Sequence, residues 1–169
     1  MAFIRKNIEE LQMNPVNMIG KEWFLLTSGT PEDYNTMTCS WGGIGVIWNA
    51  PSLTAYVRTT RHTFGYLEKN NTFTVSVFPE EYRKALAFCG SHSGRDCNKA
   101  KETGLTPVSL DGVPAFAEAK LVFVCEKVYA QMLAKDAFVR KELLEDYYAK
   151  DAMHKMYLGK ITAVYENQA

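Results

Sequence analysis

The longest alternation of apolar and polar residues in the chain runs from Ala115 to Met132. Apolar side chains occupy odd positions up to Cys125 and even positions from Val128 onward. A period of two is the pattern of a β-strand, and a change of phase requires one extra residue, so we expect a bulge or sharp bend near Glu126. A long strand that bends in this way is typical of a β-barrel.

Shorter alternating or apolar runs indicate further strands. They are Glu22–Thr27, Thr36–Trp41, Val46–Trp48, Leu53–Arg58, Phe73–Val77 and Tyr157–Tyr165. The residues Asn49–Ser52 predict a four-residue turn that makes an antiparallel hairpin of the strands on either side. Six or seven strands joined mostly by hairpins, with helices inserted, predict one domain over residues 1–169. Its fold class is mainly β, a barrel with accessory helices rather than a doubly wound sheet.

Helical patterns lie between and around these strands. They cover Ile4–Leu11, Thr63–Asn70, a helix from Pro79 to about Cys89, a short helix ending at Gly104, and Asp136–Tyr148. Pro79 suits a first helical position, Gly90 suits the position after the end of that helix, and Asp96 can cap the short helix. The last pattern is amphipathic, because an apolar residue stands at every fourth position from Val139 to Tyr147.

The charge balance excludes one broad class of partner. Lys plus Arg number 19 and Asp plus Glu number 19, so the chain has no general electrostatic attraction to nucleic acid or to an anionic membrane. The longest stretch without charged residues, Tyr34–Val57, is too polar to cross a bilayer. Residues 1–10 contain no apolar signal-peptide core, so we expect a cytoplasmic protein with reduced cysteines.

Three side chains that can bind metals are close in sequence: Cys89, His92 and Cys97. A tetrahedral metal site needs a fourth ligand, and this spacing matches no common zinc pattern. We therefore favour unliganded side chains and expect no metal. The chain also has no CxxC pair, so we expect all four cysteines to be packing residues.

The strongest local signal for chemistry is the segment Arg58–Thr63, which lies where a predicted strand ends and a predicted helix begins. A helix N-terminus offers unpaired N–H groups and partial positive charge, and two guanidinium groups with several hydroxyls beside it could hold a phosphate. The alternative is an ordinary capped helix with solvated arginines. The chain has neither a Walker loop nor GxGxxG, so a triphosphate site or a Rossmann site is not supported.

A second polar feature is the row of hydroxyls at Thr36, Thr38 and Ser40, which we expect to lie beside the face that carries Tyr56 and Arg58. Such a row can line a ligand groove, or it can be the solvent face of a barrel strand. The loop 90–96 is rich in small polar residues and could close over a ligand or merely connect two helices. His154 stands alone in the sequence, which favours a packing role.

Four segments, taken together, resemble the flavin reductase-like family, and most nearly its flavoredoxin-type members. They are Asn35–Gly42, Val57–Thr63, Ser91–Lys99 and His154–Ile161, and they occur in the family's order. The similarity extends over roughly Trp23 to Val164. One departure is that Thr59 and His62 stand where the family often has proline and an aromatic residue. The arginines and threonines around them remain.

The resemblance implies an FMN-binding split β-barrel that forms a homodimer, with FMN near the subunit interface. The implied cofactor-binding residues are Asn35; Met37, Thr38, Cys39, Ser40 and Trp41 beside the isoalloxazine; Arg58, Thr60, Arg61 and Thr63 at the phosphate; and Ser91, Ser93, Gly94 and Lys99 in a loop over or beside the ring.

The resemblance further implies flavin-dependent redox chemistry, for which FMN supplies the reactive group. Three hypotheses remain open: an NAD(P)H-dependent flavin reductase, an electron carrier that works with a redox partner protein, and a module that holds FMN without turnover. The sequence assigns no catalytic residue, because hydride transfer to a flavin requires no general acid or base. It also leaves open the electron donor, the final acceptor and whether FMN is a prosthetic group or a substrate.

Overall fold

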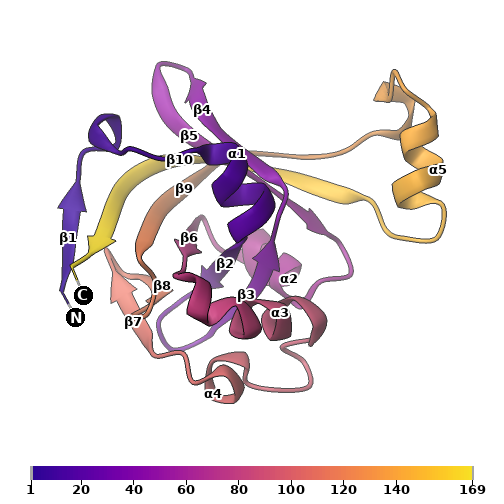
Figure 1. Cartoon of the computed structure of the whole chain (residues 1–169). Helices are drawn as coiled ribbons and strands as arrows, with labels where there is room; N and C mark the ends of the chain where they lie inside the picture. Colours follow the sequence, from indigo (N-terminus) through magenta and orange to yellow (C-terminus); the bar gives the residue numbers. More distant parts are fainter. Residues whose placement is uncertain (1, 169) are drawn as a thin grey trace.

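A curved antiparallel sheet forms the body of the protein in a computed structural model that describes residues 2–168 (Figure 1). Its strands are β1 (Phe3–Lys6), β2 (Phe24–Gly29), β3 (Tyr34–Cys39), β4 (Gly42–Ile47), β5 (Ala50–Arg58), β6 (Thr72–Val77), β9 (Leu121–Met132) and β10 (His154–Asn167). The order along the sheet is β3-β2-β6-β9-β10-β5-β4, and β1 pairs with β10. A separate hairpin consists of β7 (Pro107–Leu110) and β8 (Val113–Phe116).

The sheet curls into a barrel that stays open between its two ends. Met37 of β3 belongs to the same buried cluster as Leu53 and Val57 of β5, although the two strands are not paired. Phe73 and Tyr157, both fully buried, fill the middle of this cluster. The mainly β barrel predicted from the sequence is therefore confirmed, and the opening lies beside β3 and β5.

The bend predicted near Glu126 is confirmed. Leu158 pairs with Tyr129 and Gly159 pairs with Lys127, so Val128 is an extra residue in β9 and forms a bulge. A Cβ atom on Gly159 would lie 2.5 Å from the Phe73 ring, which explains a glycine at this bend. The predicted single strand from 115 to 132 is wrong in one respect, because turn residues 117–118 separate β8 from β9.

Short helices lie around the barrel and on the segment between β9 and β10. They are α1 (Pro15–Asn17), which continues into a π-helical turn (Met18–Glu22), α2 (His62–Lys69), α3 (Arg83–Ser91), α4 (Lys99–Thr103) and α5 (Glu142–Tyr148); single 3₁₀ turns lie at Ile8–Glu10, Glu80–Tyr82 and Lys135–Ala137. No helix among residues 2–168 has the length and apolar character needed to span a membrane.

Two local predictions are wrong at the ends of the barrel strands. The expected helix at Ile4–Leu11 is replaced by β1, because pairing with β10 gives residues 3–6 sheet hydrogen bonds. The expected four-residue turn is a two-residue turn, with Trp48 at φ 50° and Asn49 at φ 56°, and β5 starts at Ala50. Two positive φ values match the twist of a hairpin, which favours this tighter turn.

Two predicted helix ends also differ. Gly90 lies inside α3, which continues to Ser91. Asn98 rather than Asp96 caps α4, since its side chain accepts a hydrogen bond from the Lys101 N–H. The other end of α4 is as predicted, with Gly104 in the left-handed conformation at φ 70°.

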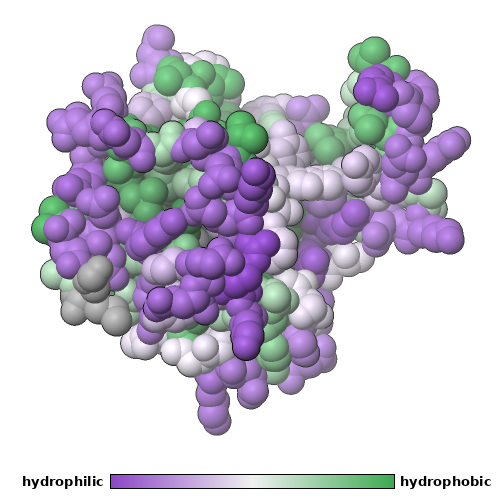
Figure 2. All heavy atoms as spheres, viewed as in Figure 1, coloured by the Kyte–Doolittle hydropathy of each residue, from purple (hydrophilic) through white to green (hydrophobic). Residues whose placement is uncertain are grey.

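Residues 133–153, named the arm here, leave the barrel between β9 and β10 and carry α5 away from it (Figure 1). The predicted helix Asp136–Tyr148 is shortened to α5, and only the C-terminal end of α5 packs on the barrel, where Tyr147 meets Trp41. Val139 is 97% exposed and Tyr147 is 47% exposed. Hydrophobic spheres are visible at the outer end of the arm and over the β4–β5 hairpin (Figure 2).

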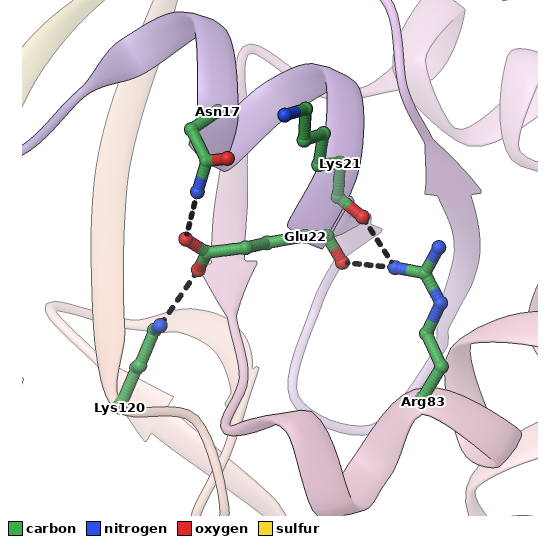
Figure 3. Close-up of polar contacts among 5 residues, drawn as sticks. All are labelled: Asn17, Lys21, Glu22, Arg83 and Lys120. Atoms are coloured by element: carbon green, nitrogen blue, oxygen red, sulfur yellow. Dashed lines mark hydrogen bonds and ion pairs between the residues drawn. The ribbon is translucent and has the colours of Figure 1, made fainter.

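Hydrogen bonds and an ion pair around Glu22 hold the segment before β2, residues 15–22, against the barrel (Figure 3). The Glu22 carboxylate accepts hydrogen bonds from Asn17 Nδ2 (2.8 Å) and Lys120 Nζ (2.6 Å). Arg83 donates to the main-chain carbonyl of Glu22 (2.9 Å), and its guanidinium lies over the Trp23 ring. These contacts fix α1 and its π-helical extension beside β4, so that they form one wall of the site described below.

Candidate functional site

A continuous trough runs along the barrel opening, and its first part, the polar end, lies at the start of α2. This hollow of about 310 Å³ sits between the α2 N-terminus and the loop after α3. Its lining residues are Met37, Arg58, Thr60, Arg61, His62, Thr63, Ser91, His92, Ser93, Gly94, Arg95, Lys99 and Asp151. Unpaired main-chain N–H groups at a helix start favour an anion in this position.

Positive charge dominates the polar end. Arg61 and Arg95 line it, and beside them Lys99 is 6% exposed. Lys99 Nζ donates to the carbonyl oxygens of Thr36 (2.9 Å) and Cys89 (2.7 Å), and no carboxylate in the described residues forms an ion pair with it. Burial lowers the pKa of this ammonium, so an anionic ligand would supply the counter-charge that the protein lacks.

The loop over the polar end approaches β3 closely. A Cβ atom on Gly94 would lie 1.9 Å from Asn35 Oδ1, so only glycine permits this contact. Asn35 Nδ2 in turn donates to Oγ1 of the buried Thr63 (2.7 Å). Asn35 therefore lies behind the polar end as a support and does not line it.

The middle of the trough is a hollow of about 220 Å³ that shares Met37, Arg58 and Arg61 with the polar end. Its lining residues are Met37, Thr38, Cys39, Ser40, Trp41, Tyr56, Arg58, Arg61 and His154. Strand β3 ends here and the chain turns into β4, which brings the 37–41 segment along the opening of the barrel.

His154 is held in this middle part by two aromatic neighbours. Its Nδ1 lies 2.9 Å from the Tyr148 hydroxyl, and its ring centroid lies 4.8 Å from that of Trp41. Burial, with Arg58 and Arg61 nearby, lowers the pKa of His154 to about 4. The imidazole is therefore neutral at neutral pH and can form one wall of a site for an uncharged ring.

The far part, the apolar end, is a hollow of about 680 Å³ that shares Ser40, Trp41 and Tyr56 with the middle. Its lining residues are Pro15, Val16, Ile19, Gly20, Ser40, Trp41, Gly42, Gly43, Ile44, Tyr56, Leu133 and Tyr148. The whole trough thus has a cationic, hydroxyl-bearing end and an aromatic, aliphatic end. A ligand with a phosphate at one end and a large flat ring at the other matches this arrangement.

The structure brings together all but one of the fourteen residues that the sequence singled out. Thirteen line the polar end or the middle of the trough, and Asn35 stands behind them. The sequence reasoning placed Tyr56 on the face beside the hydroxyl row and Arg95 in the loop 90–96, but it assigned neither to the cofactor. It missed Tyr148, which only the fold brings in, and it interpreted His154 as a packing residue.

The hydroxyl row on β3 is not arranged as expected. Strand β3 pairs with β2 rather than with β5, so the row does not lie beside Tyr56 through sheet pairing. Thr36 Oγ1 lies 2.9 Å from Thr27 Oγ1, and the Thr38 hydroxyl donates to the Leu86 carbonyl. These two hydroxyls are therefore used inside the fold, and only Ser40 at the end of the row reaches the apolar end.

Two cysteines near the trough, Cys39 and Cys89, are held as thiols by burial. Burial raises the pKa of Cys39 to about 12 and that of Cys89 to about 11. Cys97 is half-buried in the loop before α4, and its Sγ donates to the Ser93 carbonyl at 3.6 Å. His92 stacks on Phe88 with ring centroids 3.9 Å apart. Among residues 2–168 no group of three potential metal ligands is close enough to bind an ion.

A further hollow of about 660 Å³ lies between the N-terminal segment and the barrel, and it shares no lining residue with the trough. Ion pairs cross its rim, Lys6 with Glu166 (3.0 Å) and Lys120 with Glu22 (2.6 Å). Four of its charged groups are thereby paired within the protein, in contrast to Lys99.

The model of the flavin reductase-like domain matches residues 18–169 of the chain. Among solved structures, an FMN-binding protein of Thermus thermophilus with bound p-hydroxybenzaldehyde is 19% identical, with 97% of this chain and 82% of that chain covered and a TM-score of 0.69. The flavoredoxin of Desulfovibrio vulgaris (Miyazaki F) is 20% identical, with 98% and 78% covered and a TM-score of 0.68.

An NADH:FAD oxidoreductase of Streptomyces globisporus also has this fold, at 18% identity, with 86% of this chain and 75% of that chain covered and a TM-score of 0.63. At these identities the similarity to solved structures establishes the fold alone. No curated protein matches the chain in sequence.

Proposed function

The chain belongs to the flavin reductase-like family, and on that premise we propose that it binds FMN and serves as a flavin-dependent oxidoreductase. The observation that carries the proposal is the unpaired cation Lys99 at one end of a trough whose other end is aromatic. The FMN phosphate would lie at the α2 start, beside Arg61, Thr63 and Lys99. The ring system would lie in the middle and apolar parts of the trough.

Bound FMN supplies the redox chemistry, and the residues of this chain bind it, orient it and exclude water around it. Met37 and Trp41 would pack against the flat ring, and Tyr56 would close the opposite side. The loop 91–99 would hold the phosphate end in place. We propose NADH or NADPH as the electron donor, because the trough is open at its apolar end and leaves room for a second ring.

A binding experiment tests the cofactor. FMN and riboflavin differ only in the phosphate, so titration by flavin fluorescence should give a lower Kd for FMN by about 10- to 100-fold. Equal Kd values for the two flavins would contradict the phosphate site. Failure to bind either would contradict FMN as the ligand.

A kinetic experiment tests the reaction. The purified FMN-loaded protein is mixed with NADH or NADPH, with and without free flavin as acceptor, and oxidation of the nicotinamide is followed. Turnover with free flavin supports a flavin reductase. Reduction only by a protein donor would instead support the electron carrier, and failure of both donors to reduce the bound flavin would support a binding module.

We also propose that two copies form a homodimer through the face that carries the β4–β5 hairpin. Val46 is 77% exposed and Trp48 is 66% exposed at its tip, and Tyr129 of β9 lies beside Trp48 with ring centroids 6.5 Å apart. This hydrophobic surface is visible over the hairpin in Figure 2. A symmetric interface there would cover apolar side chains that the single chain leaves in water.

A further inference from the structure

Arg58 is directed at the arm. Its Nη1 donates to the Ala152 carbonyl (2.8 Å) and its Nη2 to the Tyr147 carbonyl (3.3 Å). Its Nη1 also lies 3.5 Å from Asp151 Oδ2. Within residues 2–168 every hydrogen bond and ion pair of this guanidinium goes to the arm, even though the residue lines the polar end.

The arm meets the barrel at the same place. The Tyr147 ring packs edge-on against Trp41 with centroids 5.4 Å apart, and the Tyr148 ring lies 5.5 Å from the Arg58 guanidinium. The Tyr148 hydroxyl also reaches His154. Beyond these contacts the outer end of the arm is exposed, as Val139 shows. The arm is therefore fastened to the barrel chiefly where it walls the trough.

Arg61 contrasts with Arg58 in this respect. Arg61 donates one side-chain hydrogen bond, to the Gly90 carbonyl at 2.7 Å, and among the described residues its guanidinium forms no ion pair. It lines both the polar end and the middle of the trough. Two arginines three residues apart, which are equivalent in the sequence, thus have different partners in the fold.

We propose that Arg58 is a positioning residue that clamps arm residues 147–152 onto the barrel, and that Arg61 and Lys99 bind the phosphate without it. The clamp holds Tyr148 against the apolar end and against His154, so it shapes the part of the trough that would receive the ring. The inference rests on the proposed function for the identity of the ligand. The fastening of the arm is independent of any ligand.

Two measurements show whether Arg58 clamps the arm or binds the FMN phosphate. Limited trypsin digestion followed by mass spectrometry measures cleavage in the arm at Arg140, Lys141 and Lys150, relative to the exposed Lys101 on α4. Fluorescence titration measures the Kd values of FMN and riboflavin. Arg58→Ala is compared with Arg61→Ala, which is the matched control three residues away.

In Arg58→Ala we expect faster cleavage of the arm with Lys101 unchanged, and FMN and riboflavin affinities that fall by the same factor. In Arg61→Ala we expect arm cleavage as in the wild type and a loss of about tenfold or more for FMN only. Unchanged arm cleavage in Arg58→Ala would overturn the clamp. A loss confined to FMN in that variant would overturn it equally.

Arg58→Lys provides a second variant that keeps the charge. A lysine can reach only one of the two carbonyls, so we expect arm cleavage between that of the wild type and that of Arg58→Ala, with the ratio of FMN to riboflavin Kd unchanged. Arm cleavage equal to that of the alanine variant, with a normal near-ultraviolet circular dichroism spectrum, would overturn the two-carbonyl clamp. If the wild type binds neither flavin, the proposed function fails, while the digestion still decides the clamp.

Discussion

The polar and apolar ends of the trough are built in different ways. Apart from Met37 and Asp151, the polar end comes from two continuous segments, 58–63 and 91–99, each of which lies at the start of a helix or leads into one. The apolar end combines α1, the β3–β4 connection, β5 and the arm, which are far apart in the sequence. A site for a charged group can be encoded locally, because helix starts and glycine loops create it. A site for a flat ring requires walls that only the folded chain brings together.

The strongest test of this comparison is Lys99→Met, which removes the buried charge from the polar end while keeping the length of the side chain. We expect FMN affinity to fall by about 10- to 100-fold, because a charge-assisted contact to the phosphate is lost. Riboflavin affinity should stay the same, since the apolar end is untouched. Fluorescence titration of both flavins measures the difference.

Lys101→Met is the matched control, because Lys101 is exposed on the same helix and does not line the trough. It should leave both affinities unchanged. Thermal unfolding of the two variants would show whether loss of the hydrogen bonds to Thr36 and Cys89 weakens the fold itself. An equal loss of both flavins in Lys99→Met would mean that the two ends are not independent.

The same division explains what the sequence could predict. The Arg58–Thr63 segment, the loop with Gly94 and the alternation of β3 are local patterns, and the structure places nearly all of these residues along the trough. The pairing of β3 with β2 is also local, because only residues 30–33 connect the two strands, and the sequence reasoning missed it by placing the hydroxyl row beside β5. The sequence leaves His154 isolated because Trp41 is far away in the chain and the fold is needed to bring Tyr148 onto the imidazole.

The arm shows the other limit of sequence reasoning. The spacing of Val139, Leu143 and Tyr147 is correct for an amphipathic helix, but a helix of that length needs a surface against which to bury its apolar side. Among residues 2–168 the barrel offers such a surface only at Tyr147 and Tyr148, while Val139 stays exposed, and α5 is confined to Glu142–Tyr148. Periodicity alone indicates that an apolar side exists, and it does not indicate what covers it.

His154, in the middle of the trough next to the apolar end, should make the free energy of unfolding depend on pH. The pKa of His154 falls from 6.5 to about 4 on folding, so the unfolded chain binds more protons between these values. The free energy of unfolding should therefore rise by about 2 kcal/mol as the pH increases from 4 to 6.5, and the contribution of His154 should level off about one pH unit above that. Urea unfolding at several pH values measures this slope.

His154→Gln removes the titration and should flatten that part of the profile. An identical acid slope in the variant and the wild type would show that His154 does not titrate as its burial beside Trp41 predicts.

Changes in the hairpin beside the apolar end should affect dimer formation and should not affect phosphate binding at the polar end. Trp48→Asp places a charge in the proposed interface, and we expect the dimer dissociation constant to rise by about tenfold or more. Light scattering at micromolar concentration should show a shift from twice 19.1 kDa toward 19.1 kDa.

Val139→Asp offers a control at an even more exposed apolar site on the arm, and there we expect no change in mass. Trp48→Gly separates the loss of the interface side chain from backbone strain, since glycine accepts the positive φ of this turn. It should weaken the dimer while stabilising the isolated chain. A wild type of 19.1 kDa at these concentrations would contradict the homodimer.

The smallest effect is expected for Cys97→Ser, at the polar end. Cys39 and Cys89 are kept as thiols by burial, which leaves the half-buried Cys97 as the cysteine near the trough best placed for chemistry of its own. Its Sγ donates to the Ser93 carbonyl, and a serine hydroxyl can donate in its place. FMN affinity and the rate of flavin reduction by NAD(P)H should therefore both remain within about twofold of the wild type. A variant that binds FMN normally and is no longer reduced would place a thiol in the path of the electrons. The polar end would then take part in the chemistry, and the separation between a binding end and a reacting end would no longer hold.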